Sequence, residues 1–346
     1  MNAIKHRRTI HTLAETGYCE FETSAYVKSV LYRLGCEVIS VSQTGVAAFF
    51  DFGKEQTAAV RAELDALPIK ENTGLAFAAR NGNMHACGHD AHAAMLLSLC
   101  ETLSSGRKPD KNVLAIFQPA EELTGGAESV ISSGLLPLRN VTEAYAVHLM
   151  PGLLKGRIFS REGVIFAGSE EADVTFSCGG GHIAGSAPDA AVCAARFLLS
   201  AKMKLGAIGA RANFGVIRAG AARNISAPCA EIYGTLRYFS EPERCAEEEI
   251  LRELAAASEC ACRVALRAYA PPVNNSQALF ARSAAEKLAV PIACADDFAL
   301  YGGEVPEILY MLLGIGSTPP LHSDRFDFDE NVMESGIGAY IKLLGC

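Results

Sequence analysis

The chain of 346 residues lacks any hydrophobic run long enough to cross a membrane. No apolar segment approaches the about 20 residues that a spanning helix needs. Residues 1–12 are polar and basic and lack the hydrophobic core of a secretory signal. We therefore expect a cytoplasmic protein that has no membrane partner.

The chain also lacks a cluster of lysines and arginines, and its formal net charge is −8. Binding to a phosphate backbone depends on such clusters, so we expect no nucleic-acid partner. Without a secretory signal, the 12 cysteines favour reduced thiols over a disulfide framework. Cys260 and Cys262 have no second pair nearby and lead into a strand-like segment, which indicates a structural role for them.

Half of the residues are hydrophobic, and the length suits two domains. Short apolar, β-branched or aromatic runs alternate with helical patterns, as in an α/β fold with a doubly wound, mostly parallel sheet covered on both faces. The predicted strands are 38–41, 46–52, 57–64, 113–117, 145–149 and 308–315, and the predicted helices are 21–36, 91–103 and 277–288.

The pattern changes near residue 167 and returns near residue 271. Between these points the sequence predicts a self-contained α+β series, with a strand at 172–177 and helices at 190–203 and 241–258. We therefore expect a larger domain of residues 1–168 plus 271–346. A smaller α+β domain, residues 169–270, is inserted into it.

The stretch from Met84 to His92 contains one thiol, three imidazoles and a carboxylate. These side-chain types bind zinc and similar metals, and a Cys-x-His pair across a glycine can direct both side chains at one centre. The pair here is Cys87 and His89. The other two histidines, His85 and His92, are interpreted as supporting residues or as residues that flank the helix beginning near Asp90.

Further candidate residues lie where predicted strands end, and they are Asp65, Glu121, Glu122, His148 and His322. In open α/β sheets this edge is where ligands bind, so loops far apart in sequence can converge there. Cys87, His89, Glu122, His148 and His322 would give one ligand more than a single tetrahedral site uses. A site for two metals that share the thiolate fits this set better.

Glu121 and Glu122 are adjacent carboxylates. One can bind a metal while the other takes a proton from the attacking water and passes it to the leaving amine. The alternative is a solvated acidic pair at the start of a helix, where carboxylates favour the positive end of the dipole. The pair alone does not decide between these hypotheses.

Four motifs resemble those of one known family. They are Arg61-Ala62-Glu63-Leu64-Asp65-Ala66-Leu67-Pro68, Met84-His85-Ala86-Cys87-Gly88-His89-Asp90, Phe117-Gln118-Pro119-Ala120-Glu121-Glu122 and Leu321-His322-Ser323-Asp324-Arg325-Phe326-Asp327. In this order they are similar to the aminoacylase-like, metal-dependent amidohydrolases of the hippurate hydrolase and N-acetyl-diaminopimelate deacetylase type. Such enzymes have a dinuclear catalytic domain and an inserted dimerisation domain, and they cut the amide of N-acyl amino acids. The resemblance therefore implies that residues 1–168 plus 271–346 are the catalytic, metal-binding domain and that residues 169–270 are the dimerisation or lid domain.

The resemblance implies a role for each candidate residue of the metal site. Cys87 would bridge two metals, with His89 and His148 on one and Glu122 and His322 on the other. Glu121 would be the general base and acid, and Asp65 would orient the ligands.

The resemblance also implies roles for residues of the insertion. His182 would polarise the scissile carbonyl in the partner subunit's active site, and Asn224 and Arg237 would hold the substrate carboxylate. The chain has Cys178-Gly179-Gly180-Gly181-His182 where the family usually has Gly-Lys-Gly-Gly-His.

These observations predict a homodimeric amidohydrolase that cleaves N-acyl amino acids with metal-activated water. It would use two divalent ions, zinc or manganese by preference, with cobalt or nickel also compatible. One alternative is a dipeptidase or aminopeptidase, which would have to recognise a free amine. Others are a degenerate member that binds metal and ligand without turnover, and a thiol-rich redox or metal-storage protein.

Overall fold

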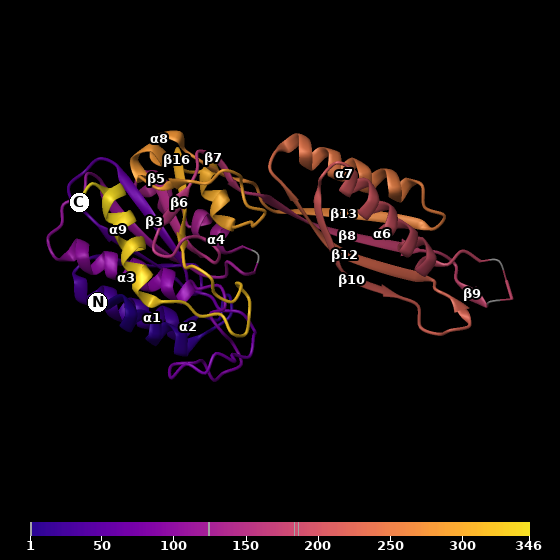
Figure 1. Cartoon of the computed structure of the whole chain (residues 1–346), viewed down its shortest axis with the longest axis horizontal. Coiled ribbons are helices and arrows are strands. Elements are labelled where there is room, and N and C mark those ends of the chain that lie inside the picture. Colours follow the sequence, from indigo (N-terminus) through magenta and orange to yellow (C-terminus); the bar gives the residue numbers. More distant parts are fainter. Residues whose placement is uncertain (1, 124, 183, 186) are drawn as a thin grey trace. The chain divides into compact units, whose positions relative to one another are not determined.

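The structure is a computed structural model that describes residues 2–123, 125–182, 184–185 and 187–346 (Figure 1). The chain forms two compact units. The first contains Met1–Ile165, Asn274–Val290 and Asp297–Cys346, and the second contains Phe166–Val273 and Pro291–Asp296. Strands β7 (Gly163–Phe166) and β14 (Val273–Asn275) contain two of the points at which the chain passes from one unit to the other. Among the described residues, no helix is long and apolar enough to cross a membrane.

The first unit is built on an eight-stranded sheet with the strand order β1-β2-β4-β3-β5-β16-β6-β15. The four central strands β4, β3, β5 and β16 are parallel to one another, and antiparallel pairs occur toward the edges. Every residue of β3 and β4 is buried, as expected for a parallel sheet covered on both faces. The strands are β1 (Glu37–Val41), β2 (Gly45–Phe50), β3 (Thr57–Glu63), β4 (Asn112–Gln118), β5 (Val141–Met150), β6 (Ile158–Ser160), β15 (Glu286–Lys287) and β16 (Glu307–Gly314).

Helices α1, α2, α3 and α9 of this unit pack on one another, and α3 also contacts β3. The helices are α1 (Asn2–Leu13), α2 (Phe21–Leu31), α3 (His89–Ser104), α4 (Gly126–Ser132), α5 (Leu135–Leu138), α8 (Gln277–Ser283) and α9 (Met333–Leu344), with 3-10 turns η1 (Tyr32–Leu34), η2 (Asp297–Gly303) and η3 (Glu330–Val332).

Two predictions of local structure need correction. The predicted helix 277–288 was too long: α8 ends at Ser283 because Ala284 adopts a left-handed φ of 55°, and Glu286–Lys287 pairs with β6 instead. The N-terminal segment, for which no element was predicted, forms α1. Its buried His6, Arg7 and His11 are polar residues, so hydrophobic periodicity gave little signal.

The second unit has a four-stranded antiparallel sheet with the order β10-β12-β8-β13, on which α6 and α7 pack. The side chains of Asp189 and Ser240 cap the first turns of these helices by accepting backbone N–H groups. The elements are β8 (Gly168–Ser177), β9 (Gly181–His182), α6 (Ala190–Ala207), β10 (Arg211–Ala219), β11 (Ile225–Ser226), β12 (Cys229–Tyr238), α7 (Glu241–Ala256) and β13 (Ala261–Ala270). The predicted insertion 169–270 lies within this unit.

Candidate metal centre

Cys87 and His89 are placed by a turn that only glycine fits. Between them Gly88 has a φ of +88°, which L side chains rarely adopt. A Cβ built there would lie 2.8 Å from the Cδ1 atom of Leu149. The turn ends directly at His89, the first residue of α3.

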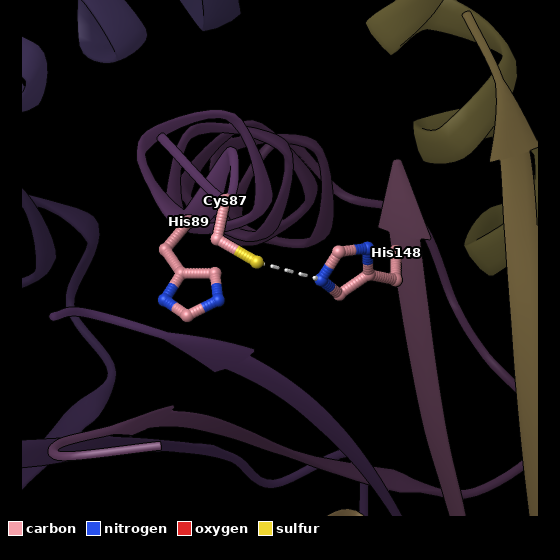
Figure 2. A group of neighbouring side chains, drawn as sticks. All are labelled: Cys87, His89 and His148. Carbon is pink, nitrogen blue, oxygen red and sulfur yellow. Dashed lines mark hydrogen bonds between the residues drawn. The ribbon is translucent and has the colours of Figure 1, made fainter. Parts of the chain in front are cut away.

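The side chains of Cys87, His89 and His148 converge in the first unit (Figure 2). Their ligand atoms all lie within 4.8 Å of one another, and we call these residues the first donor group. His148 Nε2 lies 3.5 Å from Cys87 Sγ. His148 Nδ1 lies 2.7 Å from the carbonyl oxygen of Leu149, to which it donates, and this leaves the Nε2 lone pair facing the thiol. Burial lowers the pKa of His148 to about 3, so the imidazole is neutral, as a metal ligand must be.

His89 is oriented by Asp65. Its Nδ1 donates to the backbone carbonyl of Asp65 at 3.0 Å and lies 3.2 Å from the Asp65 Oδ1 atom. Its Nε2 is buried without a hydrogen-bond partner among the described residues. Histidines that bind metals commonly donate their other ring N–H to a carboxylate or carbonyl in this way.

Cys87, Glu122 and His322 form a second donor group, again with ligand atoms within 4.8 Å of one another. His322 Nε2 lies 3.2 Å from Glu122 Oε1. His322 adopts a φ of 65°, unusual for a residue other than glycine, while its backbone N–H donates to Ala86 at 2.9 Å. Burial opposes ionisation of the Glu122 carboxyl, but the adjacent His322 imidazole outweighs this effect and lowers the pKa of Glu122.

Cys87 therefore belongs to both donor groups. Burial raises the pKa of its thiol well above the usual range, so the thiolate needs a nearby cation to persist. A thiol, imidazoles and a carboxylate are ligands that fit zinc and related divalent ions. In the part of the chain that the structure describes, the buried Nε2 of His89 also has no hydrogen-bond partner. This chemistry fits two cations that share one sulfur.

Glu121 lies beside both donor groups. It is buried, and its Oε2 is 3.8 Å from His89 Nε2. His89, Glu121 and Glu122 also form a cluster whose ligand atoms lie within 4.8 Å of one another. The loop after β4 therefore turns two adjacent carboxylates toward one centre, although a regular strand would point them to opposite faces.

The two remaining histidines of the motif differ in their contacts. His92 uses both ring nitrogens: Nδ1 donates to Glu63 at 2.7 Å, and Nε2 accepts the backbone N–H of Leu149 at 3.0 Å. Both ring nitrogens of His85 are buried without a hydrogen-bond partner among the described residues. Burial lowers the pKa of His85 to about 3, so its ring is neutral.

The candidate residues of the second unit do not all come together. His182 lies in β9 and pairs with Ile225, the residue that follows Asn224. Strand β12 begins at Cys229, and Arg237 lies near its other end. Roughly 26 Å of strand therefore separates Arg237 from Cys229. Burial lowers the pKa of Arg237, and its Nη1 is buried without a hydrogen-bond partner among the described residues.

The sequence analysis named only one of the three carboxylates that hold the loop bearing Glu121 and Glu122, which is Asp65. Three buried carboxylates accept backbone N–H groups of this loop and its end. Glu20 accepts from Ala120 at 2.8 Å, Asp65 from Glu122 at 2.9 Å, and Asp297 from Ala127 at 2.8 Å. Glu20 and Asp297 are far from the loop in sequence, so no local pattern could have identified them.

Comparison with known proteins decides the family. The model of peptidase family M20/M25/M40 matches residues 59–345, which include both donor groups. The chain belongs to this peptidase family. Membership confirms the resemblance to metal-dependent amidohydrolases and the expectation of an enzyme that hydrolyses amide bonds.

Relatives in the M20 family match the chain over nearly its whole length. An N-acetyldiaminopimelate deacetylase of Lactococcus lactis subsp. cremoris is 33% identical, over 98% of this chain and 96% of that protein. The corresponding deacetylase of Shouchella clausii is 30% identical over 99% of this chain and 98% of that protein.

Solved structures of M20 proteins share the fold, which confirms the predicted α/β architecture. The Bacillus subtilis YXEP protein, described as a dinuclear metal-binding peptidase of the M20 family, is 27% identical with a TM-score of 0.86 over 99% of this chain and 96% of its own. A Staphylococcus aureus tripeptidase is only 14% identical, with a TM-score of 0.76 over 99% of this chain and 97% of its own, and shows the fold alone.

Proposed function

We propose that this M20 protein hydrolyses the amide bond of N-acyl amino acids with two divalent metal ions held by the two donor groups. The observation that carries this proposal is the sharing of Cys87 between the groups, with the carboxylate of Glu121 beside them. The name of the Bacillus subtilis neighbour, a dinuclear metal-binding peptidase, supports two metals. The thiolate and imidazoles favour zinc, and manganese is the second candidate.

Glu121 is the proposed general base and acid. Bound divalent ions would supply Lewis acidity toward the water and the substrate carbonyl. Glu121 would take a proton from the attacking water at its carboxylate and deliver it to the nitrogen of the leaving amine. Asp65 would act through His89, since it accepts the His89 N–H and thereby fixes the direction of the Nε2 lone pair.

The proposed substrate class is an acetylated amino acid with a carboxylate next to the amide nitrogen. Two relatives that cover nearly the whole chain at 30% identity or more are named N-acetyldiaminopimelate deacetylases, so N-acetyldiaminopimelate is the first compound to test. Arg237 and Asn224 are the proposed contacts of the substrate carboxylate, and His182 is the proposed contact of the scissile carbonyl. The buried Nη1 of Arg237 finds no hydrogen-bond partner in the described parts of the chain, which supports a polar ligand there.

We propose further that the second unit forms a homodimer. Apolar side chains are exposed on α6 and on the neighbouring edge strand β10: Leu199 is 67% and Met203 75% exposed, and Val216 and Ile217 are 40% and 51% exposed. An edge strand beside exposed apolar side chains is suited to pairing with a second copy. A dimer also accounts for the separation of Arg237 from His182 along one chain, because two chains could supply them to one substrate.

The test is amino-acid release by metal-reconstituted protein from N-acetyldiaminopimelate and from N-acetyl, N-benzoyl and N-indole-acetyl amino acids, with dipeptides included. Wild type is compared with Glu121→Gln and with Glu55→Gln, a matched change on the exposed surface. We expect turnover in wild type and Glu55→Gln, and a loss of at least about 100-fold in Glu121→Gln while bound metal persists.

Cleavage of dipeptides without cleavage of N-acyl amino acids would show that the protein is a peptidase and would refute the proposed function. The absence of all turnover in a fully metal-loaded protein would favour a binding protein without catalysis.

A further inference from the structure

Cysteine side chains gather at one end of the four-stranded sheet of the second unit. Cys178 directly follows β8, Cys260 directly precedes β13, Cys262 lies in β13, and Cys193 lies in α6 above them. The antiparallel register pairs Ser177 with Ala261, so Cys178 and Cys260 are the next opposite positions of the two strands. Residues that lie opposite in a ladder point to the same face of the sheet.

The cysteines also share one hydrophobic cluster of the second unit. Cys193 and Cys260 belong to this cluster, and Cys178 packs against it. Cys193 and Cys260 are buried, whereas Cys178 is half-buried and so accessible to a small solute. Opposite residues in an antiparallel ladder have Cα atoms about 4.5 to 5.5 Å apart, within the about 4.4 to 6.8 Å that disulfides span.

A metal site is less suited to this cluster than a disulfide. Among the described residues, the sets of three or more ligand atoms within 4.8 Å of one another do not include these cysteines. Of these four cysteines, Cys178 and Cys260 are the two that the strand register places opposite each other.

We propose that Cys178 and Cys260 are an oxidation site, at which a peroxide converts two thiols into a cross-strand disulfide. The half-buried Cys178 sulfur attacks a peroxide oxygen, the O–O bond breaks, and the thiol proton passes to the departing oxygen, so that a sulfenic acid forms with release of water. The Cys260 sulfur then attacks the Cys178 sulfur, and the S–O bond breaks as the Cys260 thiol proton passes to the departing oxygen and a second water leaves. Two thiols lose two electrons and two protons, and one peroxide is reduced to two waters.

The disulfide would alter the segment that carries His182. In the reduced structure, Cys178 Sγ donates to the carbonyl oxygens of Pro188 at 3.4 Å and Ala227 at 3.6 Å. These bonds tie the two ends of residues 178–188 together and join them to the chain beside β11. Because a disulfide has no S–H, oxidation removes both bonds, and residues 179–189 should exchange backbone hydrogens faster.

The test is treatment of the full, metal-loaded chain with hydrogen peroxide, followed by blocking of free thiols and mapping of unreduced peptides by mass spectrometry. Variants Cys178→Ser and Cys260→Ser are compared with Cys229→Ser. Cys229 is exposed and lies opposite Ser177, so it points to the other face of the sheet. Serine retains an O–H donor at position 178, so the first variant keeps the local hydrogen bonds.

We expect a peptide that joins Cys178 to Cys260 in wild type and in Cys229→Ser, and none in the other two variants. Hydrogen exchange in residues 179–189 should rise by at least about two-fold on oxidation of wild type, and not in Cys178→Ser. Oxidation of Cys229 in place of the pair, a disulfide between Cys193 and Cys260, or the absence of any disulfide would overturn the proposal.

Discussion

Replacement of Asp297 by asparagine should both destabilise the first unit and slow catalysis. Asp297 is buried, and it accepts from Arg61 Nη2 at 2.6 Å, from Gln118 Nε2 at 2.9 and 2.8 Å, and from the Ala127 N–H at 2.8 Å. Gln118 ends β4 and Ala127 lies in the first turn of α4, so this one carboxylate holds both ends of the loop that carries Glu121.

The size of the effect follows from the burial of the pair. Both Arg61 and Asp297 have side chains no more than 2% exposed, and breaking a buried ion pair costs roughly 3 to 5 kcal/mol. Arg61 keeps its contact with Glu63 in the variant, so we expect a loss of unfolding free energy at the lower end of this range, about 3 kcal/mol. At roughly 2 to 4 °C per kcal/mol for a domain of this size, the midpoint of thermal unfolding should fall by about 6 to 12 °C.

The catalytic effect is separable from the loss of stability. A displaced loop moves Glu121 relative to the substrate, so kcat should fall roughly 10- to 100-fold while KM changes much less. The control is Leu309→Ala, a buried residue of β16 whose truncation costs roughly 2 to 5 kcal/mol and whose apolar side chain makes no hydrogen bond to the loop. Calorimetry gives the unfolding midpoint of each variant. Steady-state kinetics are then measured well below these midpoints.

Two results would refute the reasoning about Asp297. An unfolding midpoint within about 1 °C of wild type would show that the buried pair contributes little to stability. An Asp297→Asn protein that is destabilised like Leu309→Ala but has the kcat of wild type would show that the loop does not depend on this carboxylate.

Three further predictions concern other parts of the chain. The Cys87→Ser variant should bind metal at least about 10-fold more weakly at both sites, measured by chelator competition, because the sulfur that it lacks belongs to both donor groups. Weaker binding at one site only would contradict a sulfur shared by two metals. Glu247→Gln should stabilise the protein by roughly 1 to 3 kcal/mol at pH 8 and have no such effect near pH 4, measured by denaturant unfolding. Burial and the charges of nearby glutamates raise the pKa of Glu247 from 4.5 to about 7, so the folded protein loses stability as the pH rises from 4.5 through 7. Equal effects of the substitution at both pH values would exclude this cause, and Glu249→Gln is the control. Met203→Glu should give monomers at micromolar concentration in light scattering, whereas Tyr32→Glu, exposed on the first unit, should not; an unchanged dimer would exclude the α6 face.

The central sheet could be predicted because its pattern is local. Short apolar strands such as 113–117 and 145–149 alternate with helices, and buried parallel strands need apolar residues on both faces. The ends of α8 and the presence of α1 could not be predicted in the same way. Ala284 takes a left-handed conformation within its tertiary context, and α1 buries charged residues such as Arg7 against partners from distant segments.

The candidate site was partly predictable for a related reason. Residues that end parallel strands meet at one edge of a sheet, so the order of strands and helices along the chain was enough to group Glu122 with Asp65. The separation of Arg237 from His182 could not be seen in this way, because it depends on the direction and length of β12 within the second unit.

The sequence by itself determined the fold class, the family and the set of residue types that can bind metals, because these depend on periodicity and on short motifs. Only the tertiary structure decided which atoms meet. It shows that the thiol of Cys87 belongs to two donor groups, and that Glu20 and Asp297 hold the backbone of one loop. The contacts of Cys87 with His148, of Glu20 with Ala120 and of Asp297 with Ala127 join residues more than 60 positions apart. Their hydrogen bonds depend on directions in space that no local pattern encodes.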